Sequence, residues 1–265
     1  MPRKKKSELE VETNDPGQID FLTNAHVKLE RAEIKSNQVY QILRGAIANL
    51  ELKPGATINE RAICEYLGIS RTPFREAILR LNAEHLVSVV PNRETRIAPI
   101  SVGDVFDGQF VRQAIELVAV KMAARKPDKR FLDDLEVNMY KQKKFLTEKD
   151  ASSFFQCDEE FHQLICQQGS SKRVWQVVHQ AKAQLDRVRC LAFPGLPDHL
   201  SEVYAEHSLI YSAILSGNSD DAEQAMEKHL GRQVRQVKEL LKVNPEYFTA
   251  DAQATADFLA ERYAH

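Results

Sequence analysis

Three features that mark membrane and secreted proteins are missing from the sequence. No apolar run approaches the roughly 18 residues that a membrane helix needs, so we expect no membrane span. The four cysteines form no Cys-x-x-Cys pair, and a chain of 265 residues can bury a core without disulfides. The basic run at residues 2–6 is not followed by an apolar segment, so it is not a secretory signal. These absences favour a cytoplasmic protein with reduced thiols.

A strong surplus of positive charge is also missing, since the formal net charge is −2. The distribution of charge is more informative than the total. Residues 36–98 hold eight Lys or Arg and six Asp or Glu, so this segment is locally positive. A small DNA-binding module needs local positive charge and not a basic whole protein. The charge pattern is therefore compatible with DNA binding without demanding it.

The N-terminal half alternates short helices with a predicted hairpin. Apolar spacing and turn residues predict helices at 36–50, 59–67 and 71–84. Two short strands are expected at 86–90 and 95–98, on either side of a Pro-Asn-Arg turn. Helix, helix, tight turn, helix and hairpin is the layout of a winged helix-turn-helix domain.

The second and third helices carry the features of a DNA-reading pair. Ser70 is placed to cap the third helix, so that Arg71, Thr72 and Arg75 lie on its first turn and a half and face outward. Such side chains can reach base edges, whereas Arg61 on the second helix is placed for backbone phosphate. Two arginines alone would equally fit a solvated helix face. The turn, the cap and the hairpin together favour the recognition helix.

From Ser101 onward the sequence shows helical periodicity and no strand pattern. We predict helices at about 101–125, 130–147, 151–168, 171–192, 200–216 and 219–242. Each has an apolar face, so the fold class is mainly α, with an all-helical bundle after the winged domain. The predicted division is a flexible N-terminal tail at 1–30, a winged helix-turn-helix domain at 31–99, the helical domain at 100–243 and a partly helical C-terminal tail at 244–265.

Three of the eight histidines, with one aspartate, have the spacing of a metal site. Asp158 and His162 are four residues apart and share one helix face. His207 and His229 lie at similar distances on either side of the Gly217 turn, so an antiparallel helical hairpin would bring them level. One carboxylate and three imidazoles suit zinc, nickel, iron or manganese. The alternative is that each histidine is a polar surface or cap residue.

Residues 53–98 resemble the winged-helix domain of the GntR family. The resemblance rests on Pro54-Gly55 and on the stretch LGISRTPFREAI from Leu67 to Ile78. It implies DNA contacts from Arg61, Ser70, Arg71, Thr72, Arg75 and the wing tip. Family members usually have glycine at two positions where this chain has other residues, namely His85 and, at the wing tip, Glu94. At the wing tip, Arg93 could make the DNA contact instead.

Residues 104–240 resemble the FCD effector domain of the FadR branch of that family. The matching pieces are Arg-x-x-x-Glu at 112–116, Asp-x-x-x-His at 158–162, and a Glu-His pair followed by a final histidine at 206–229. The resemblance implies a divalent metal ion held by Asp158, His162, His207 and His229. It also implies a small carboxylate effector paired with Arg112. From spacing alone, Arg112 would form a surface salt bridge with Glu116.

Three classes of function follow from these patterns. The chain could be a ligand-responsive transcription regulator, a metal-dependent hydrolase with a DNA-binding tether, or an architectural DNA-binding protein. No nucleophile motif supports the hydrolase, and the architectural class does not explain four metal ligands. We therefore predict a regulator without enzymatic activity, with one divalent transition metal per chain, zinc first. We expect a nucleoid-associated homodimer on a palindromic double-stranded DNA operator, since two-fold symmetry is the usual route to specificity.

Overall fold

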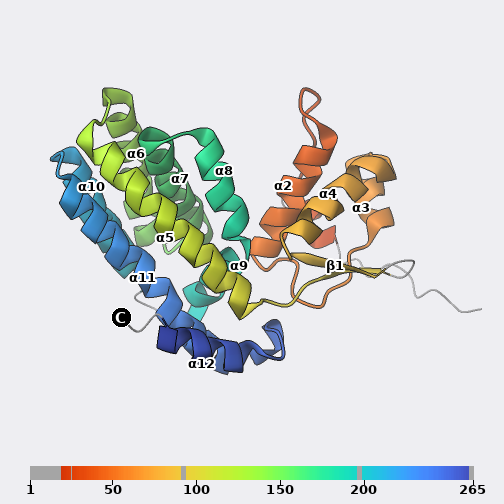
Figure 1. Cartoon of the computed structure of the whole chain (residues 1–265). Helices are drawn as coiled ribbons and strands as arrows, with labels where there is room; N and C mark the ends of the chain where they lie inside the picture. The colour runs from red at the N-terminus through yellow and green to blue at the C-terminus, as the bar shows by residue number, and fades with distance from the viewer. Residues whose placement is uncertain (1–18, 25, 91–93, 196–198, 263–265) are drawn as a thin grey trace, which may run out of the picture.

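The computed structural model describes residues 19–24, 26–90, 94–195 and 199–262. Within these ranges the chain forms two lobes, a small N-terminal one with helices and a two-stranded sheet and a larger helical one (Figure 1). The predicted mainly α fold class, a winged helix-turn-helix followed by an all-helical bundle, is confirmed. None of the described helices is long and apolar enough to cross a membrane.

The N-terminal lobe is built around the packing of α2 against α4. Its elements are α1 (Asp20–Asn24), α2 (Lys35–Ala48), α3 (Glu60–Leu67), α4 (Arg71–Ala83), β1 (Val87–Val90) and β2 (Glu94–Ile97). Val39, Leu43 and Leu81 are fully buried in its core because they repeat at helical spacing on the facing sides of α2 and α4. Leu79, on the same helix as Leu81, is 67% exposed.

The turn between α3 and α4 follows local sequence rules. Asn59 accepts a hydrogen bond from the Ala62 amide and caps α3. Gly68 ends the helix with φ 61, a left-handed conformation that glycine adopts without steric cost. Ser70 occupies the N-cap position of α4, as expected, but its side chain makes no capping hydrogen bond.

The end of the predicted N-terminal tail packs against this lobe. Phe21 and Leu22, on α1, are buried in the same core as α2 and α4. The Tyr66 hydroxyl donates to the Leu22 carbonyl over 3.1 Å. Residues 20–24 were predicted to belong to a flexible tail. They are instead part of the folded lobe, because the apolar side chains of Phe21 and Leu22 are buried in its core.

The wing is an antiparallel pair with Val87 opposite Ile97 and Val90 opposite Glu94. Just before it, His85 has φ 55, the left-handed conformation in which the GntR pattern usually has glycine. The His85 ring contacts Asp104 of the larger lobe, with Nδ1 and Oδ2 3.0 Å apart. The non-glycine residue at this position thus supplies a side chain that reaches the second domain.

The larger lobe surrounds a long central helix, α5, which packs against α7 and α11. Its helices are α5 (Val102–Arg125), α6 (Lys129–Glu148), α7 (Ala151–Gly169), α8 (Lys172–Ala181), α9 (Ala183–Gly195), α10 (His199–Leu215) and α11 (Ser219–Val243). The single helix expected at 171–192 is wrong, because it is interrupted at Lys182. There α5 passes so closely that a Cβ on Gly108 would lie 2.5 Å from the Ala181 carbonyl oxygen. Tertiary packing therefore decides this break.

The C-terminal segment is a short 3-10 helix, η2 (Pro245–Tyr247), followed by α12 (Ala252–Arg262). Phe248, Ala252 and Ala256 are buried against the base of the larger lobe. The backbone of Ile100, in the linker between the lobes, bonds to Tyr247 and Thr249 over 2.8 and 3.0 Å. This segment, predicted as a partly helical tail, is thus attached to the linker.

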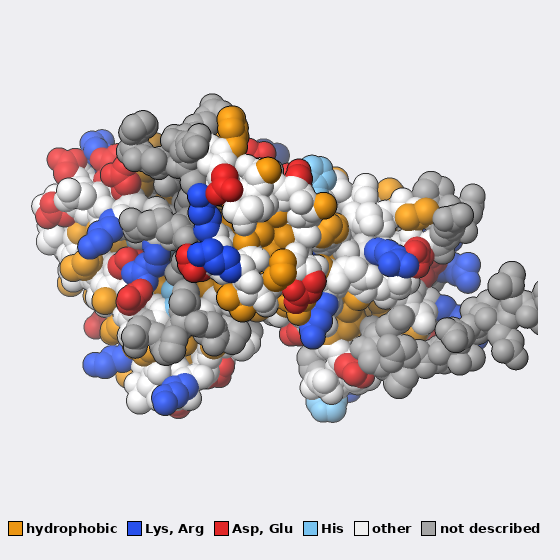
Figure 2. Space-filling model, turned by 90° about the horizontal axis from the view of Figure 1, so that it is seen from below, with side chains coloured by type: hydrophobic (Ala, Val, Ile, Leu, Met, Phe, Trp, Pro, Cys, Tyr) orange, Lys and Arg blue, Asp and Glu red, His pale blue; other side chains and the backbone are white. Residues whose placement is uncertain are grey.

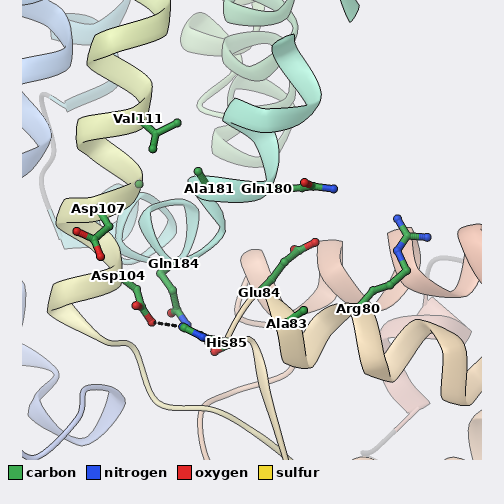
Figure 3. Close-up of a pocket in the computed structure, with 11 residues that line it drawn as sticks. Arg80, Ala83, Glu84, His85, Asp104, Asp107, Val111, Gln180, Ala181 and Gln184 are labelled. Atoms are coloured by element: carbon green, nitrogen blue, oxygen red, sulfur yellow. Dashed lines mark hydrogen bonds and ion pairs between the residues drawn. The ribbon is translucent and has the colours of Figure 1, made fainter. Parts of the chain in front are cut away.

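Between the lobes lies a cleft of about 420 Å³ (Figure 3). It is lined by the end of α4, by α5 and by the α8–α9 junction. Beside it, Gln184 donates to the His85 carbonyl over 2.7 Å, and Arg187 donates to the Ala98 carbonyl over 2.8 Å. The lobes are therefore joined by specific polar contacts around a space that side chains leave open.

Candidate metal centre and DNA-binding face

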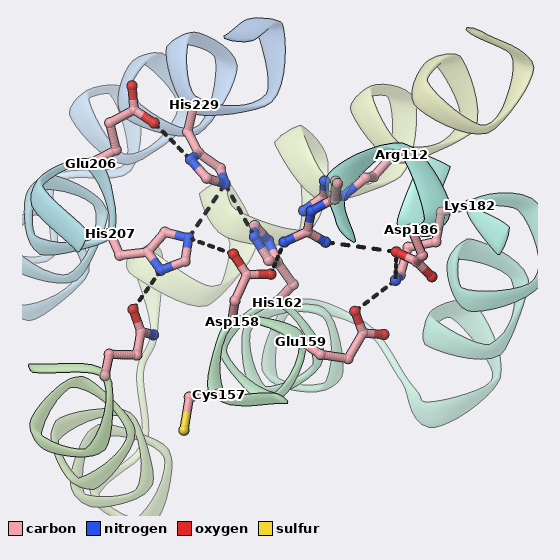
Figure 4. A network of polar contacts seen from close by, with 12 residues as sticks. Arg112, Cys157, Asp158, Glu159, His162, Lys182, Asp186, Glu206, His207 and His229 are labelled. Carbon is pink, nitrogen blue, oxygen red and sulfur yellow. Dashed lines mark hydrogen bonds and ion pairs between the residues drawn. The ribbon is translucent and has the colours of Figure 1, made fainter. Parts of the chain in front are cut away.

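Four side chains from three helices meet inside the larger lobe (Figure 4). Asp158 and His162 lie one turn apart on α7, His207 lies on α10 and His229 on α11. All four are buried, and one potential ligand atom from each lies within 4.8 Å of the others. The turn at Gly217, with φ 73, makes α10 and α11 antiparallel and brings their histidines level. The structure therefore brings together the four predicted metal ligands.

The ring nitrogens at the centre of this cluster are very close to one another. The Nε2 atoms of His162 and His229 are 3.2 Å apart, and those of His207 and His229 are 3.3 Å apart. The Nε2 of His207 is 3.6 Å from Oδ1 of Asp158. Three nitrogens and one carboxylate oxygen thus face a common point.

The other ring nitrogens of two histidines face carboxylates. Nδ1 of His162 lies 2.6 Å from Oε2 of Glu116, and Nδ1 of His229 lies 2.9 Å from Oε2 of Glu206. Because an ionised carboxylate only accepts hydrogen bonds, a neutral ring beside it carries its proton on Nδ1. The Nε2 lone pairs of both rings are then left to face the centre.

The tautomer of His207 is assigned by a chain of amides. Asn138 donates its side-chain amide to the Cys157 carbonyl over 2.9 Å, so its oxygen accepts from Nε2 of Gln142 over 2.7 Å. The Gln142 oxygen is then the atom that lies 2.8 Å from Nδ1 of His207. This ring also carries its proton on Nδ1 and presents a bare Nε2.

Three lone pairs and a carboxylate oxygen that face one another form a donor set suited to a cation. Lone pairs at 3.2–3.3 Å without a shared proton repel each other, and burial removes the water that could separate them. Outer acceptors that orient each imidazole are also the arrangement found around metal-bound histidines. The donor set of one oxygen and three nitrogens could therefore hold a divalent transition metal ion.

Electrostatics keep the four ligands in the protonation states that a metal requires. Burial lowers the pKa of His162 to about 4, although Glu116 acts against this shift. Burial likewise lowers the pKa values of His207 and His229. For Asp158, burial acts to raise the pKa, but the positive charge of Arg189, together with that of Arg112, outweighs it and holds the pKa well below its usual value. The rings are neutral and the carboxylate is ionised at pH 7.

Arg112 lies next to this cluster and is 1% exposed. Its Nε atom is 2.6 Å from Oε1 of Glu116, whose other oxygen lies 2.6 Å from Nδ1 of His162. The salt bridge with Glu116 that the spacing predicts is thus present, but it is buried rather than on the surface. Burial acts to raise the pKa of Glu116, but Arg112 and His162 outweigh it and lower the pKa to about 2. Arg112 therefore connects to a metal ligand through one carboxylate.

Sequence reasoning missed several residues around the site. Glu206 adjoins His207 in the sequence, but its side chain reaches the next helix and accepts from His229 over 2.9 Å. Arg189, on α9, bonds Oδ2 of Asp158 and had no sequence signal. Gln142 could have been found, since it lies on the buried face of α6, four residues after Asn138, where apolar side chains are expected.

The predicted DNA-contacting residues lie together on one exposed face. Ser70, Arg71, Thr72 and Arg75 are exposed at the start of α4, and the side chains of Arg71 and Arg75 are 69% and 65% exposed. Their Nε atoms lie 3.6 and 3.4 Å from the same carboxylate oxygen of Glu60 on α3. The structure therefore holds both recognition-helix arginines against one acidic side chain.

Arg61 is also exposed and lies 2.8 Å from Glu65, one turn later on α3. An exposed pair of this kind contributes little to stability, so phosphate could displace Glu65. Arg93, predicted at the wing tip, lies outside the described residues. On the face seen in Figure 2, basic and acidic side chains are interspersed with hydrophobic ones.

Comparisons with known proteins agree with both domains. The model described as bacterial regulatory proteins of the gntR family matches residues 35–97, and the FCD domain model matches residues 109–232. The transcriptional repressor RspR of Escherichia coli K12 is 31% identical over 82% of this chain and 94% of its own length. A regulator in an unstable DNA locus of Streptomyces ambofaciens is 33% identical over 81% of this chain and 89% of its own.

A solved structure shows the same fold. The E. coli McbR/YncC chain superposes with a TM-score of 0.69 at 20% identity, over 77% of this chain and 96% of its own. The relatives named above are regulators and repressors, and neither matched domain is an enzyme domain. The chain belongs to the GntR family of transcriptional regulators, with a C-terminal FCD domain, and is not an enzyme.

Proposed function

We propose that this regulator binds one divalent transition metal ion at Asp158, His162, His207 and His229, and that the metal site helps to hold a small carboxylic or sugar acid that controls DNA binding. The observation that carries the proposal is the convergence of three bare Nε2 atoms while each Nδ1 is held by an acceptor. Zinc is the first candidate, because one oxygen and three nitrogens suit its tetrahedral preference.

Arg112 is the proposed partner of the effector carboxylate. A carboxylate that enters a buried site must recover the free energy lost on leaving water, and a guanidinium can bind it through two parallel hydrogen bonds. Arg112 is fully buried beside the metal ligands and is already oriented by Glu116. The metal ion and Arg112 would thus bind the same effector carboxylate.

DNA recognition is proposed for Arg61, Ser70, Arg71, Thr72 and Arg75, with Arg93 at the wing. One recognition helix reads only a few base pairs, so we propose that the protein acts as a homodimer on a palindromic operator in the cytoplasm. RspR is named a repressor, which supports repression as the direction of control. The exposure of the start of α4 supports the DNA-binding role.

The test begins with elemental analysis of protein purified without chelator, where we expect one metal ion per chain. Melting temperatures are then measured for zinc-loaded protein with a panel of small carboxylic and sugar acids. Wild type should be stabilised by at least one acid, and Arg112→Lys should lose most of that shift because a lysine cannot bind the carboxylate bidentately. Arg130→Lys, on the exposed surface of α6, is the control and should respond as wild type does.

Two results would contradict the proposal. Protein that contains no metal, and whose melting temperature does not change with zinc, nickel or manganese, would exclude the metal site. An acid that stabilises Arg112→Lys as strongly as wild type would show that Arg112 does not bind the effector.

A further inference from the structure

One arginine of the DNA-binding lobe is buried in the contact with the effector lobe. Arg44, on α2, is only 4% exposed. Its guanidinium lies 3.0 Å from the ring nitrogen of His179 on α8 and also bonds the His179 carbonyl. On its other side, its Nε atom lies 3.2 Å from Glu84, the residue that ends the recognition helix α4. Arg44 therefore contacts the effector lobe and the recognition helix at once.

From Arg44 a series of buried charged side chains leads to the proposed metal site, and Figure 4 shows the part of it around Asp186 and Asp158. The guanidinium lies 3.7 Å from Asp186 on α9. Asp186 also lies 3.7 Å from Arg189, which in turn bonds the proposed metal ligand Asp158. Every residue from Asp158 to Arg44 is at most 4% exposed. Charges of alternating sign thus run from the metal ligand to the end of α4.

We infer that Arg44 is a positioning residue through which the metal site controls how the recognition helix is held. The inference rests on the proposed function, because it requires that the state of the metal site affects DNA binding. It adds to that function a route, Asp158–Arg189–Asp186–Arg44–Glu84, and it assigns a role to residues that contact neither the ligand nor DNA.

The physical basis is competition for charge inside a region that solvent does not screen. Asp158 faces the centre of the site with Oδ1 and bonds Arg189 with Oδ2. A cation at the centre would attract Asp158 and weaken its ion pair with Arg189, and Arg189 would then move closer to Asp186. Asp186 would in turn hold Arg44 less closely, so that Arg44 would move toward Glu84. The ammonium group of Lys182 also lies 2.6 Å from Asp186, so this carboxylate interacts with Lys182 as well as with the two arginines.

The surroundings allow such a change to move the lobes. Glu84 lines the cleft between them, together with Arg80 of α4 and with Gln180 and Ala181 at the end of α8 (Figure 3). The cleft leaves space between the end of α4 and the end of α8. A ligand alters DNA binding only if it favours one arrangement over another, and this boundary offers the room for two.

The experiment measures coupling between zinc and DNA in the full-length protein. Affinity for a duplex selected by wild type from a random-sequence pool is measured with zinc and after removal of metal. Wild type should differ between the two states by about fivefold or more. Arg44→Gln should bring this ratio close to one while still binding zinc. By linkage, DNA should change the zinc affinity of wild type by the same ratio and leave that of the variant unchanged.

Two controls separate coupling from structural damage. Arg187→Gln removes another buried arginine at the same boundary, one that donates to the neutral oxygens of Ala98 and Gln184. It should retain the wild-type ratio even if both of its DNA affinities weaken. Arg44→Lys, which keeps the positive charge, should restore part of the ratio. If Arg44→Gln fails to fold, Asp186→Asn tests the next contact of the route in the same way.

The outcomes are distinct. A wild-type ratio in Arg44→Gln or Asp186→Asn would refute the role of this route while leaving the proposed function intact. Equal loss of the ratio in Arg44→Gln and Arg187→Gln would also refute it, since general domain packing would then carry the signal. A ratio of one in wild type itself would contradict the proposed function, and the coupling with it.

Discussion

The Nε2 atoms of His162 and His229 lie 3.2 Å apart in a fully buried site, although the Nδ1 atom of each ring is already held by a carboxylate. Two imidazoles arranged in this way cannot share a proton unless one of them gives up the proton on an Nδ1 atom that faces a carboxylate. A bound cation would remove this conflict.

Zinc should stabilise the wild-type protein and not a variant that lacks a ligand. At a zinc concentration about 100 times the dissociation constant, binding contributes about 2.7 kcal/mol, or roughly 5–10 °C in melting temperature. His229→Ala should lose most of this shift. His26→Ala, which changes an exposed histidine of the DNA-binding lobe, is the control and should keep it. An equal shift in wild type and His229→Ala, measured by differential scanning calorimetry, would remove His229 from the site.

The metal-free protein should lose stability as the pH falls from 6.5 to 4. Burial lowers the pKa of His162 to about 4, so in this window the unfolded chain binds protons that the folded chain does not. The stabilisation is therefore complete above pH 6.5, and His162 alone accounts for a loss of about 3 kcal/mol at pH 4. The free energy of unfolding of wild type and of His162→Gln is measured with denaturant at several pH values. The difference between the two proteins should change by about 3 kcal/mol between pH 6.5 and pH 4. A constant gap would show that His162 titrates normally.

Arg71 and Arg75 should contribute separately to DNA affinity. If each reaches bases, replacing it with alanine should cost roughly 1–3 kcal/mol per half-site. Arg130→Ala, an exposed arginine on α6, should have little effect. Fluorescence anisotropy at fixed salt with a selected duplex gives these values. Wild-type affinity in both Arg71→Ala and Arg75→Ala would show that the start of α4 does not read DNA.

Glu60 should weaken non-specific DNA binding. Its carboxylate lies within 3.6 Å of both recognition-helix arginines, and these exposed pairs are each worth well under 1 kcal/mol. Glu60→Gln releases both arginines and removes a charge that repels phosphate, so affinity for random-sequence duplexes should rise roughly fivefold. Glu148→Gln, which removes an exposed carboxylate far along α6, is the control. Unchanged or weaker binding by Glu60→Gln, measured over a range of salt concentrations, would argue that Glu60 merely orients the arginines.

Local sequence was sufficient for the features that depend on neighbours along the chain. The α3–α4 turn follows from Asn59 and Gly68, which satisfy backbone groups or adopt a left-handed conformation whatever surrounds them. The pairing of Asp158 with His162 follows from helix periodicity, and that of His207 with His229 from their similar distances to the Gly217 turn. Each of these relationships lies within one helix or one hairpin.

Only the tertiary structure decided which buried polar groups meet across helices. Helical periodicity indicates that Gln142, Arg189 and Arg44 lie on particular helix faces, but it does not say which helix packs opposite them. Arg112 illustrates the difference, since its spacing from Glu116 predicts the pair but not that the pair is buried beside His162. The break at Lys182 likewise follows from the close passage of Gly108, far away in the sequence. Hydrogen bonds and ion pairs between distant segments depend on the docking of whole helices, which is set by the complementary shapes of many side chains together.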